Sequence, residues 1–178
     1  MIDAARGPAQ TRSSMADDLS FSRAGAEHLP RFEQIRAAAF APVFASFRAI
    51  LGDELYELVQ ARDDAAQPAL LASMLQPDSG WEVYAAQRAA IVVGFVSVRL
   101  DPTTKVGEIG LNAVDPDHAG HGIGTAMYDF ALARMREAGM RAATVGTGGD
   151  PSHAPARRAY AKVGFDAAIP SVWMSRIL

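Results

Sequence analysis

The spacing of hydrophobic residues predicts that the first part of the chain is helical. Over residues 42–60, apolar positions recur at steps of three and four, which places them on one face of a helix. A Gly-Asp pair at 52–53 allows this stretch to divide into two pieces. The same spacing predicts helices over residues 27–40 and about 64–75, and apolar/polar alternation over residues 19–24 indicates a short strand. Two or three helices are therefore expected ahead of the main sheet.

The pattern changes in the middle of the chain to segments rich in Val, Ile, Trp and Tyr. Residues 81–87, 90–100 and 106–114 have this composition and are joined by short polar or proline-containing links, so we predict three sequential antiparallel strands. The remaining predicted elements are a helix over 122–138 closed by Gly139, a strand over 141–147, a helix over 154–163 closed by Gly164, and one or two strands within 165–178.

Length and composition indicate one folded domain. The 178 residues are 49% hydrophobic and 21% charged, which is ordinary for a globular domain with a packed core. Residues 1–16 lack periodicity and are rich in Ala, Gly, Ser and Arg, so we expect a disordered leader followed by a single domain over 17–178. The net charge is −3 and no basic block occurs, which argues against nucleic-acid binding.

Two further absences limit the chemistry. The longest apolar stretch, residues 89–98, is far shorter than the ~20 residues of a membrane helix, so we expect no membrane association. The sequence contains no cysteine, which excludes disulfides, cysteine-based zinc sites and a thiol nucleophile. This composition fits a cytoplasmic protein.

A glycine-rich turn at residues 120–125, with the sequence Gly-His-Gly-Ile-Gly-Thr, lies between a predicted strand and an amphipathic helix. Glycines let the backbone approach a ligand closely, and the free N–H groups at a helix N-terminus bind anions, so a phosphate or pyrophosphate is the expected guest. The alternative is a tight turn without a ligand. The spacing is not GxGxxG and no Gly-Lys-Ser/Thr follows, which excludes a dinucleotide-binding motif and a P-loop.

The residues around this turn extend the pattern. Residues 108–124, EIGLNAVDPDHAGHGIG, resemble the fourth strand and pyrophosphate loop of the GNAT acetyltransferase superfamily. Residues 156–165, ARRAYAKVGF, resemble the Ala…Tyr…Gly-Phe segment of the same superfamily. Together the motifs cover roughly residues 81–170.

The resemblance implies an α/β (α+β) fold of the GNAT acyltransferase type. This fold has a central mixed, mostly antiparallel sheet of six to seven strands flanked by helices, with strands four and five parallel and splayed apart. The cosubstrate is acetyl-CoA, whose pantetheine arm lies between the splayed strands and pairs with strand four. The implied cofactor-binding residues are Ala113, Val114, Ala119, Gly120, His121, Gly122, Ile123, Gly124, Thr125 and His153.

Two positions depart from the superfamily pattern. Ala119 stands where the loop usually opens with Gln or Arg, and His153 stands where the last helix usually begins with Asn. Because backbone amides do most of the phosphate binding in the superfamily, Ala119 weakens the polar support of the loop without abolishing it. His153 is expected to replace Asn as a hydrogen-bonding or capping residue.

The resemblance also implies two catalytic residues. Glu108 matches the position of the general-base glutamate of some members, and the alternative is a solvated carboxylate at the strand's entry. Tyr160 matches the tyrosine that protonates the departing thiolate, and the alternative is a ring packed under the sheet. Asp115 and Asp117 are interpreted as loop-forming residues beside Pro116. With no cysteine for an acetyl-enzyme, the expected mechanism is direct attack in a ternary complex.

The predicted function is an N-acetyltransferase that acts on a primary amine of a small molecule or peptide. The main alternative is a non-catalytic acyl-CoA-binding regulatory module, and a third is an interaction domain that does not bind CoA. The resemblance allows a homodimer. No metal site is expected, because the four histidines are irregularly spaced around loops and a helix start. Acidic residues in 53–64 are interpreted as a solvated face, with attraction of a cationic amine as the alternative.

Overall fold

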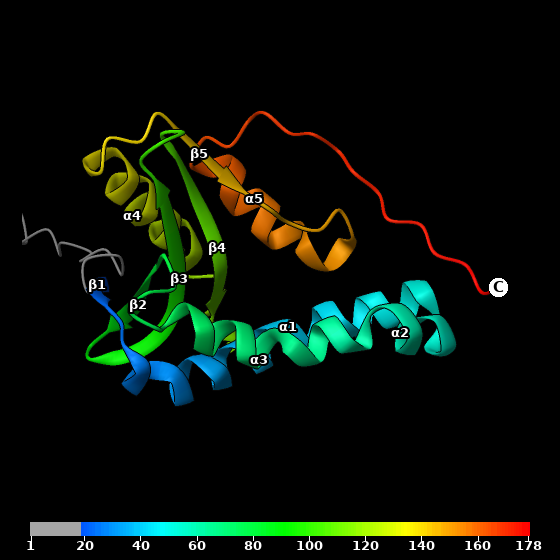
Figure 1. Ribbon diagram of the computed structural model, residues 1–178. Helices are drawn as coiled ribbons and strands as arrows, with labels where there is room; N and C mark the ends of the chain where they lie inside the picture. Colours follow the sequence, from blue (N-terminus) through cyan, green and yellow to red (C-terminus); the bar gives the residue numbers. More distant parts are fainter. Residues whose placement is uncertain (1–18) are drawn as a thin grey trace, which may run out of the picture.

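The computed structural model describes residues 19–178, and the leader expected over residues 1–16 lies outside them. The described chain forms one mixed sheet with helices on both faces (Figure 1). The strands are β1 (Leu19–Arg23), β2 (Trp81–Arg88), β3 (Ile91–Asp101), β4 (Val106–Val114) and β5 (Ala142–Val145). The helices are α1 (Leu29–Leu51), α2 (Asp53–Val59), α3 (Ala61–Met74), α4 (Ile123–Glu137) and α5 (Ala154–Lys162), with 3-10 turns η1 (Ala26–His28), η2 (Pro116–His118) and η3 (Pro151–His153).

The strands lie in the order β1-β2-β3-β4-β5. Neighbouring strands are antiparallel except β4 and β5, which are parallel. This confirms the expected mixed, mostly antiparallel sheet, and it confirms the three central strands as β2, β3 and β4. The parallel pair is joined by α4, which returns the chain across one face of the sheet.

The sheet has five described strands where six to seven were expected, and the difference lies in the last part of the chain. The prediction of one or two strands within residues 165–178 is wrong: this segment is extended, and no described strand pairs with it (Figure 1). A strand needs N–H and C=O partners, and the only edge beside it, β5, is four residues long. Pro170 also lacks an N–H to donate. The most exposed large apolar side chains here are Ile169, Val172, Trp173, Met174 and Leu178.

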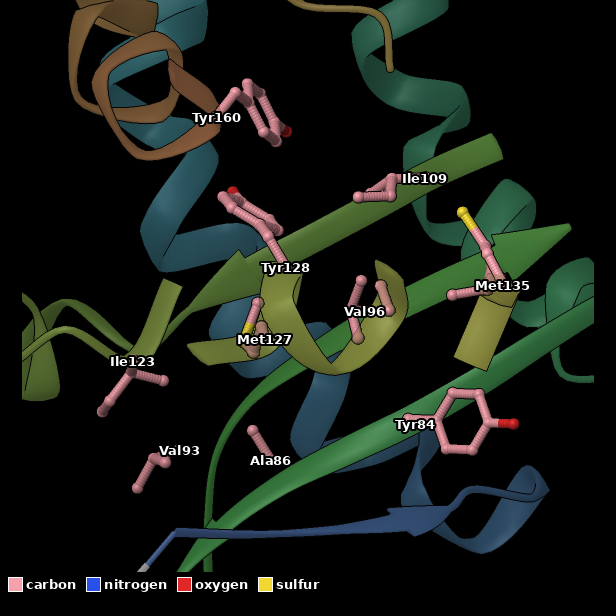
Figure 2. Packing of buried hydrophobic residues seen from close by; sticks show 12 residues of the cluster. Tyr84, Ala86, Val93, Val96, Ile109, Ile123, Met127, Tyr128, Met135 and Tyr160 are labelled. Carbon is pink, nitrogen blue, oxygen red and sulfur yellow. The ribbon is translucent and has the colours of Figure 1, made fainter. Parts of the chain in front are cut away.

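Apolar side chains from the two faces of the sheet form two cores. On the α4 face, α4 and α5 cover the sheet, and Figure 2 shows how their buried side chains meet those of the strands. The buried members of this core are Tyr84, Ala86, Val93, Val96, Val98, Ile109, Ile123, Met127, Tyr128, Ala131, Met135 and Tyr160. On the α1 face, α1 and α3 bury Phe32, Ile35, Leu71, Met74, Leu75, Val83, Ala85, Phe95 and Ala113.

Helix α1 is longer than the sequence predicts. A helix over 27–40 and a separate one after it were expected, whereas α1 runs through Pro42, which is exposed, and ends at Gly52 with a φ of 75°. Only the first part of α1 is buried on the sheet, and the rest extends past it with α2 (Figure 1). No single helix within residues 19–178 has the length and apolar composition to cross a membrane. The pair Ala26–Leu51 and Asp53–Val59 has both when taken together, but is bent by 115°.

A bulge in β4 changes which way its side chains face. Val96 pairs with Asn112 and Val98 with Ile109, so two residues of β4 lie opposite one residue of β3. Ile109 and Val114 both pack in the core of the α4 face, although they are five positions apart and would face opposite sides of a regular strand. The bulge therefore reverses the alternation between the first and second halves of β4.

Candidate active site

The glycine-rich turn becomes an uncapped helix N-terminus. Gly120 and Gly122 have φ angles of 80° and 78°, in the left-handed region that glycine adopts readily. The first hydrogen bond of α4 runs from Ala126 N–H to Gly122 C=O, so the N–H groups of Ile123 and Gly124 have no partner within the helix. In the described residues no side chain caps α4, and its first turn carries no acidic residue. This end of α4 thus has free N–H groups and no competing carboxylate, which is what an anion site requires.

A groove of about 840 Å³ begins at this helix end and runs between β4, α5 and α1. Its lining includes every residue predicted for the site except His121, whose exposed ring hydrogen-bonds with the His118 carbonyl. The predicted residues that line it are Glu108, Ala113, Val114, Ala119, Gly120, Gly122, Ile123, Gly124, Thr125, His153 and Tyr160. The fold thus brings together segments that are about 50 residues apart in the sequence.

The separation of β4 from β5 forms the floor of the groove. The two strands pair from Val106 with Ala142 to Ile109 with Val145. Beyond Ile109, β4 continues to Val114, and within the described residues no strand pairs with this edge. Residues 110–114 line the groove. Backbone N–H and C=O groups of β4 are therefore available to an extended ligand arm, as strand pairing would require.

Tyr160 is held over this floor by a chain of three polar side chains. Asn112 donates from Nδ2 to Tyr160 Oη at 3.2 Å, and it accepts from Tyr128 Oη at 2.9 Å. The rings of Tyr128 and Tyr160 lie 4.4 Å apart, and Figure 2 shows them side by side. Burial, followed by the neighbouring Tyr160, raises the pKa of Tyr128 well above its ordinary value. Tyr128 thus stays protonated and donates to Asn112 Oδ1, while the Asn112 Nδ2 group faces Tyr160.

The hydrogen-bond chain from Tyr128 through Asn112 leaves the proton of the Tyr160 hydroxyl for another partner. Tyr160 is only 6% exposed, and its oxygen accepts from Asn112. Asn112 and Tyr128 were missing from the predicted site residues. Asn112 is a polar residue in an apolar strand, which is a sequence signal for a site. Tyr128 carries no such signal, because it neighbours the apolar stripe of α4 and looks like a core residue.

Glu108 reaches the groove from a different direction than a regular strand predicts. Six residues of regular strand would put Glu108 and Val114 on one face. Because of the bulge, Glu108 lies on the α1 face and Val114 on the α4 face. Glu108 forms an ion pair with Arg99 across the β3–β4 register, and the Arg99 guanidinium lies 4.8 Å from the centre of the Trp81 ring.

His153 is anchored to α1. Its Nδ1 lies 2.5 Å from Asp150 Oδ1, and its ring stacks at 5.9 Å on Phe47. Asp150 also accepts from Ser46 Oγ at 2.8 Å and from the Ser152 N–H at 3.0 Å. Burial tends to raise the pKa of Asp150, but the hydrogen bonds from Ser152, Ser46 and His153 outweigh it and hold this pKa well below its ordinary value. The Asp150 carboxylate thus fastens the loop before α5 to α1.

Asp115 performs a similar structural task at the other end of β4. Its carboxylate caps η2 by accepting from Asp117 N–H at 3.0 Å, and it forms an ion pair with Arg31 of α1. Arg31 also donates to Val92 C=O. Burial tends to raise the pKa of Asp115, but the Asp117 N–H and Arg31 keep it below its ordinary value. The interpretation of Asp115 as a loop-forming residue is confirmed.

Three of the acidic residues in 53–64 pair with neighbouring side chains. Arg48 forms ion pairs with Asp53 and Glu57. Asp64 accepts from Tyr56 Oη at 2.6 Å and from Gln60 Nε2 at 2.9 Å. These contacts favour the structural interpretation of these acids. Among residues 19–178, no three His, Asp or Glu side chains converge in a way that could hold a metal ion.

Comparison of the sequence with known families identifies the class of protein to which this fold and groove belong. The chain belongs to the Acetyltransferase (GNAT) family, whose profile matches residues 44–165. The mycothiol acetyltransferase of Sanguibacter keddieii is a relative with 32% identity over 161 residues, which cover 81% of this chain and 50% of that protein. The chain thus spans about half the length of this curated relative.

Solved structures of low sequence identity share the fold. A putative GNAT acetyltransferase from Desulfovibrio desulfuricans superposes with a TM-score of 0.63 at 20% identity, covering 85% of this chain and 87% of the other. Aminoglycoside N-acetyltransferase AAC(6')-Iy in complex with CoA superposes with a TM-score of 0.58 at 14% identity, covering 89% and 94%.

The Asp150 anchor generates a stability prediction. Asp150→Asn should lower the free energy of unfolding at pH 7 by about 1–2 kcal/mol, because charge-assisted hydrogen bonds are replaced by neutral ones. The pKa of Asp150 is depressed in the folded state, so its stabilisation is fully present above the ordinary Asp pKa of about 4 and is lost as the pH falls below it. Urea unfolding of both proteins from pH 7 to 3 measures this difference.

The control is Asp166→Asn, which changes an exposed carboxylate. It should match the wild type at each pH. An Asp150→Asn deficit that stays constant down to pH 3 would show that the carboxylate charge is not what stabilises this loop.

Proposed function

We propose that the protein is an N-acetyltransferase that moves an acetyl group from acetyl-CoA to a primary amine by direct attack. The observation that carries the proposal is the continuity of one groove. It joins the uncapped N-terminus of α4, the unpaired edge of β4 beyond Ile109, and the buried Tyr160. Membership of the GNAT family and the likeness to a fold neighbour in complex with CoA support it.

The residues of the groove fit acetyl-CoA. The pyrophosphate would accept hydrogen bonds from N–H groups of the first turn of α4, where Gly122 and Gly124 leave the backbone open. The pantetheine arm would pair with the edge of β4 at Ala113 and Val114. His153, fixed by Asp150, offers its other ring nitrogen to the groove. Acetyl-CoA, when bound, supplies an activated thioester.

Two side chains account for the proton transfers. Tyr160 Oη accepts from Asn112, so its own proton is available to the departing thiolate. A phenol is protonated at neutral pH, which suits a general acid. Glu108 lines the groove and takes the proton of the attacking amine directly or through a water. No acetyl-enzyme is needed, since the sequence has no cysteine.

The acyl-CoA-binding regulatory module is the second candidate. The ion pair between Glu108 and Arg99 favours it, because the guanidinium already occupies the carboxylate that would accept the proton of the amine. Release of free thiol from acetyl-CoA in the presence of amines separates the two functions. Turnover supports the enzyme, whereas CoA binding without turnover supports the module.

The first prediction concerns the phosphate site. Gly124→Val should weaken CoA binding at least about tenfold, because branched methyl groups at the first turn would obstruct the approach of phosphate to the N–H groups. A Cβ at Gly124 would meet only Val114 Cγ2 at 3.9 Å, so the fold should tolerate the change. Calorimetric titration with CoA measures the affinity.

The control for this variant is Gly149→Val. Gly149 does not line the groove, and a Cβ there meets nothing within 4 Å. It should bind CoA like the wild type. Unchanged affinity in folded Gly124→Val would place the pyrophosphate elsewhere.

The second prediction is that Tyr160→Phe lowers kcat about 100-fold or more while the KM for acetyl-CoA changes little, because only the proton donor is lost. Steady-state thiol release measures both constants. Tyr84→Phe is the matched control, since it removes another buried hydroxyl outside the groove. Wild-type kcat in Tyr160→Phe would assign thiolate protonation to water.

The third prediction concerns Glu108. Glu108→Gln should keep the affinity for acetyl-CoA and lower kcat most at low pH, where the amine is largely protonated and needs a base. Rates from pH 6 to 9 give the profile. Arg99→Gln is a useful companion because it frees the Glu108 carboxylate from its ion pair. A wild-type profile in Glu108→Gln would remove this residue from the mechanism.

A further inference from the structure

One wall of the groove beyond the proposed acetyl-CoA contacts is apolar. If the phosphates occupy the end of α4 and the thioester lies at Tyr160, this wall is the stretch of α1 that faces β4, whereas the other side of the remaining space carries polar residues such as Thr147, Ser152 and Arg158. The α1 stretch contributes Ala39, Phe40, Pro42 and Val43, all of them apolar, opposite Leu111 of β4. An acceptor would therefore contact hydrocarbon along one side.

The charges around the groove are mainly positive. Among the described residues that line it, Glu108 is the single carboxylate, and Arg99 already neutralises part of its charge. Arg158 and Lys162 line the α5 side. Asp150 does not line the groove, and its carboxylate is held by Ser46 and His153, as described above.

The charges on α1 itself do not change this balance. Arg36 lies 5.8 Å from the centre of the Phe40 ring and is paired with Glu33. Farther along the helix, Arg48 holds Asp53 and Glu57. Apart from Glu108, no described carboxylate lines the groove beside the apolar stretch of α1.

From this arrangement we infer that the acceptor is a compound with a single amino group on a neutral or anionic, partly apolar body, and that polyamines are poor acceptors. This inference rests on the proposed acetyltransferase function. One ammonium group can be matched and deprotonated by Glu108. A second ammonium would lie against the aliphatic Pro42 and Val43 with no carboxylate to pair with it, and burying an unpaired charge is costly. Arg158 and Lys162 would add repulsion.

A matched pair of amines tests the inference. Hexylamine and 1,6-diaminohexane have the same carbon chain and differ by one terminal ammonium group. With saturating acetyl-CoA, kcat/KM from thiol release should be at least about tenfold higher for hexylamine, and spermidine should be as poor as the diamine. A wild-type enzyme that prefers the diamine or spermidine overturns the inference while leaving the acetyltransferase function intact.

A charge placed on the apolar wall provides the second arm. Val43→Asp should reduce the preference for hexylamine at least about tenfold, because the new carboxylate can pair with the second ammonium. Ile50→Asp is the control, since Ile50 lies on the same helix, is 63% exposed and does not line the groove. It should keep the wild-type preference.

The remaining outcomes also decide the question. Equal preferences in Val43→Asp and the wild type would show that the acceptor does not contact this wall, which overturns the inference. CoA binding without acetylation of any amine would instead refute the proposed function, and the inference with it.

Discussion

The loss of pairing between β4 and β5 after Ile109 is the constraint on which the site depends. A strand edge inside a protein normally has a neighbour, because unpaired backbone N–H and C=O groups are costly when they are buried. Here β4 continues for five residues beyond Ile109, the last residue that pairs with β5, and those residues line the groove. In this stretch the Gly110 carbonyl accepts from Asn112 Nδ2 and the Leu111 carbonyl from Ser97 Oγ, and the other groups of the edge are open to water or an extended ligand.

The bulge in β4 adds a second effect at the same place. It turns Asn112 toward Tyr160 on one face of the sheet while Glu108 remains on the other. A regular strand would present the proposed base and the Asn112–Tyr160 pair from the same side. In the proposed mechanism, the bulge would let one strand serve the amine from one face and the thiolate from the other.

The sequence predicts the elements of this site better than their partners. The turn at 120–125, Tyr160 and the order of the central elements follow from local spacing and from the family resemblance. Asn112, Tyr128 and Asp150 gain their roles from contacts between residues 16 to 104 positions apart, which no local pattern encodes. The prediction of terminal strands is wrong for a related reason, because the strand propensity of a segment does not supply a neighbouring strand with which it can pair.

Helix α1 is fastened at two points, by the pair of Arg31 with Asp115 and by the hydrogen bond of Ser46 with Asp150. Ser46 lies fifteen positions after Arg31, which is about 22 Å of helix, and the apolar stretch of α1 that lines the groove lies between them. This stretch of α1 is therefore held in place at both ends. Asp115 leads into the glycine-rich turn before α4 and Asp150 leads into α5, so a displacement of this stretch of α1 would act on both ends of the groove.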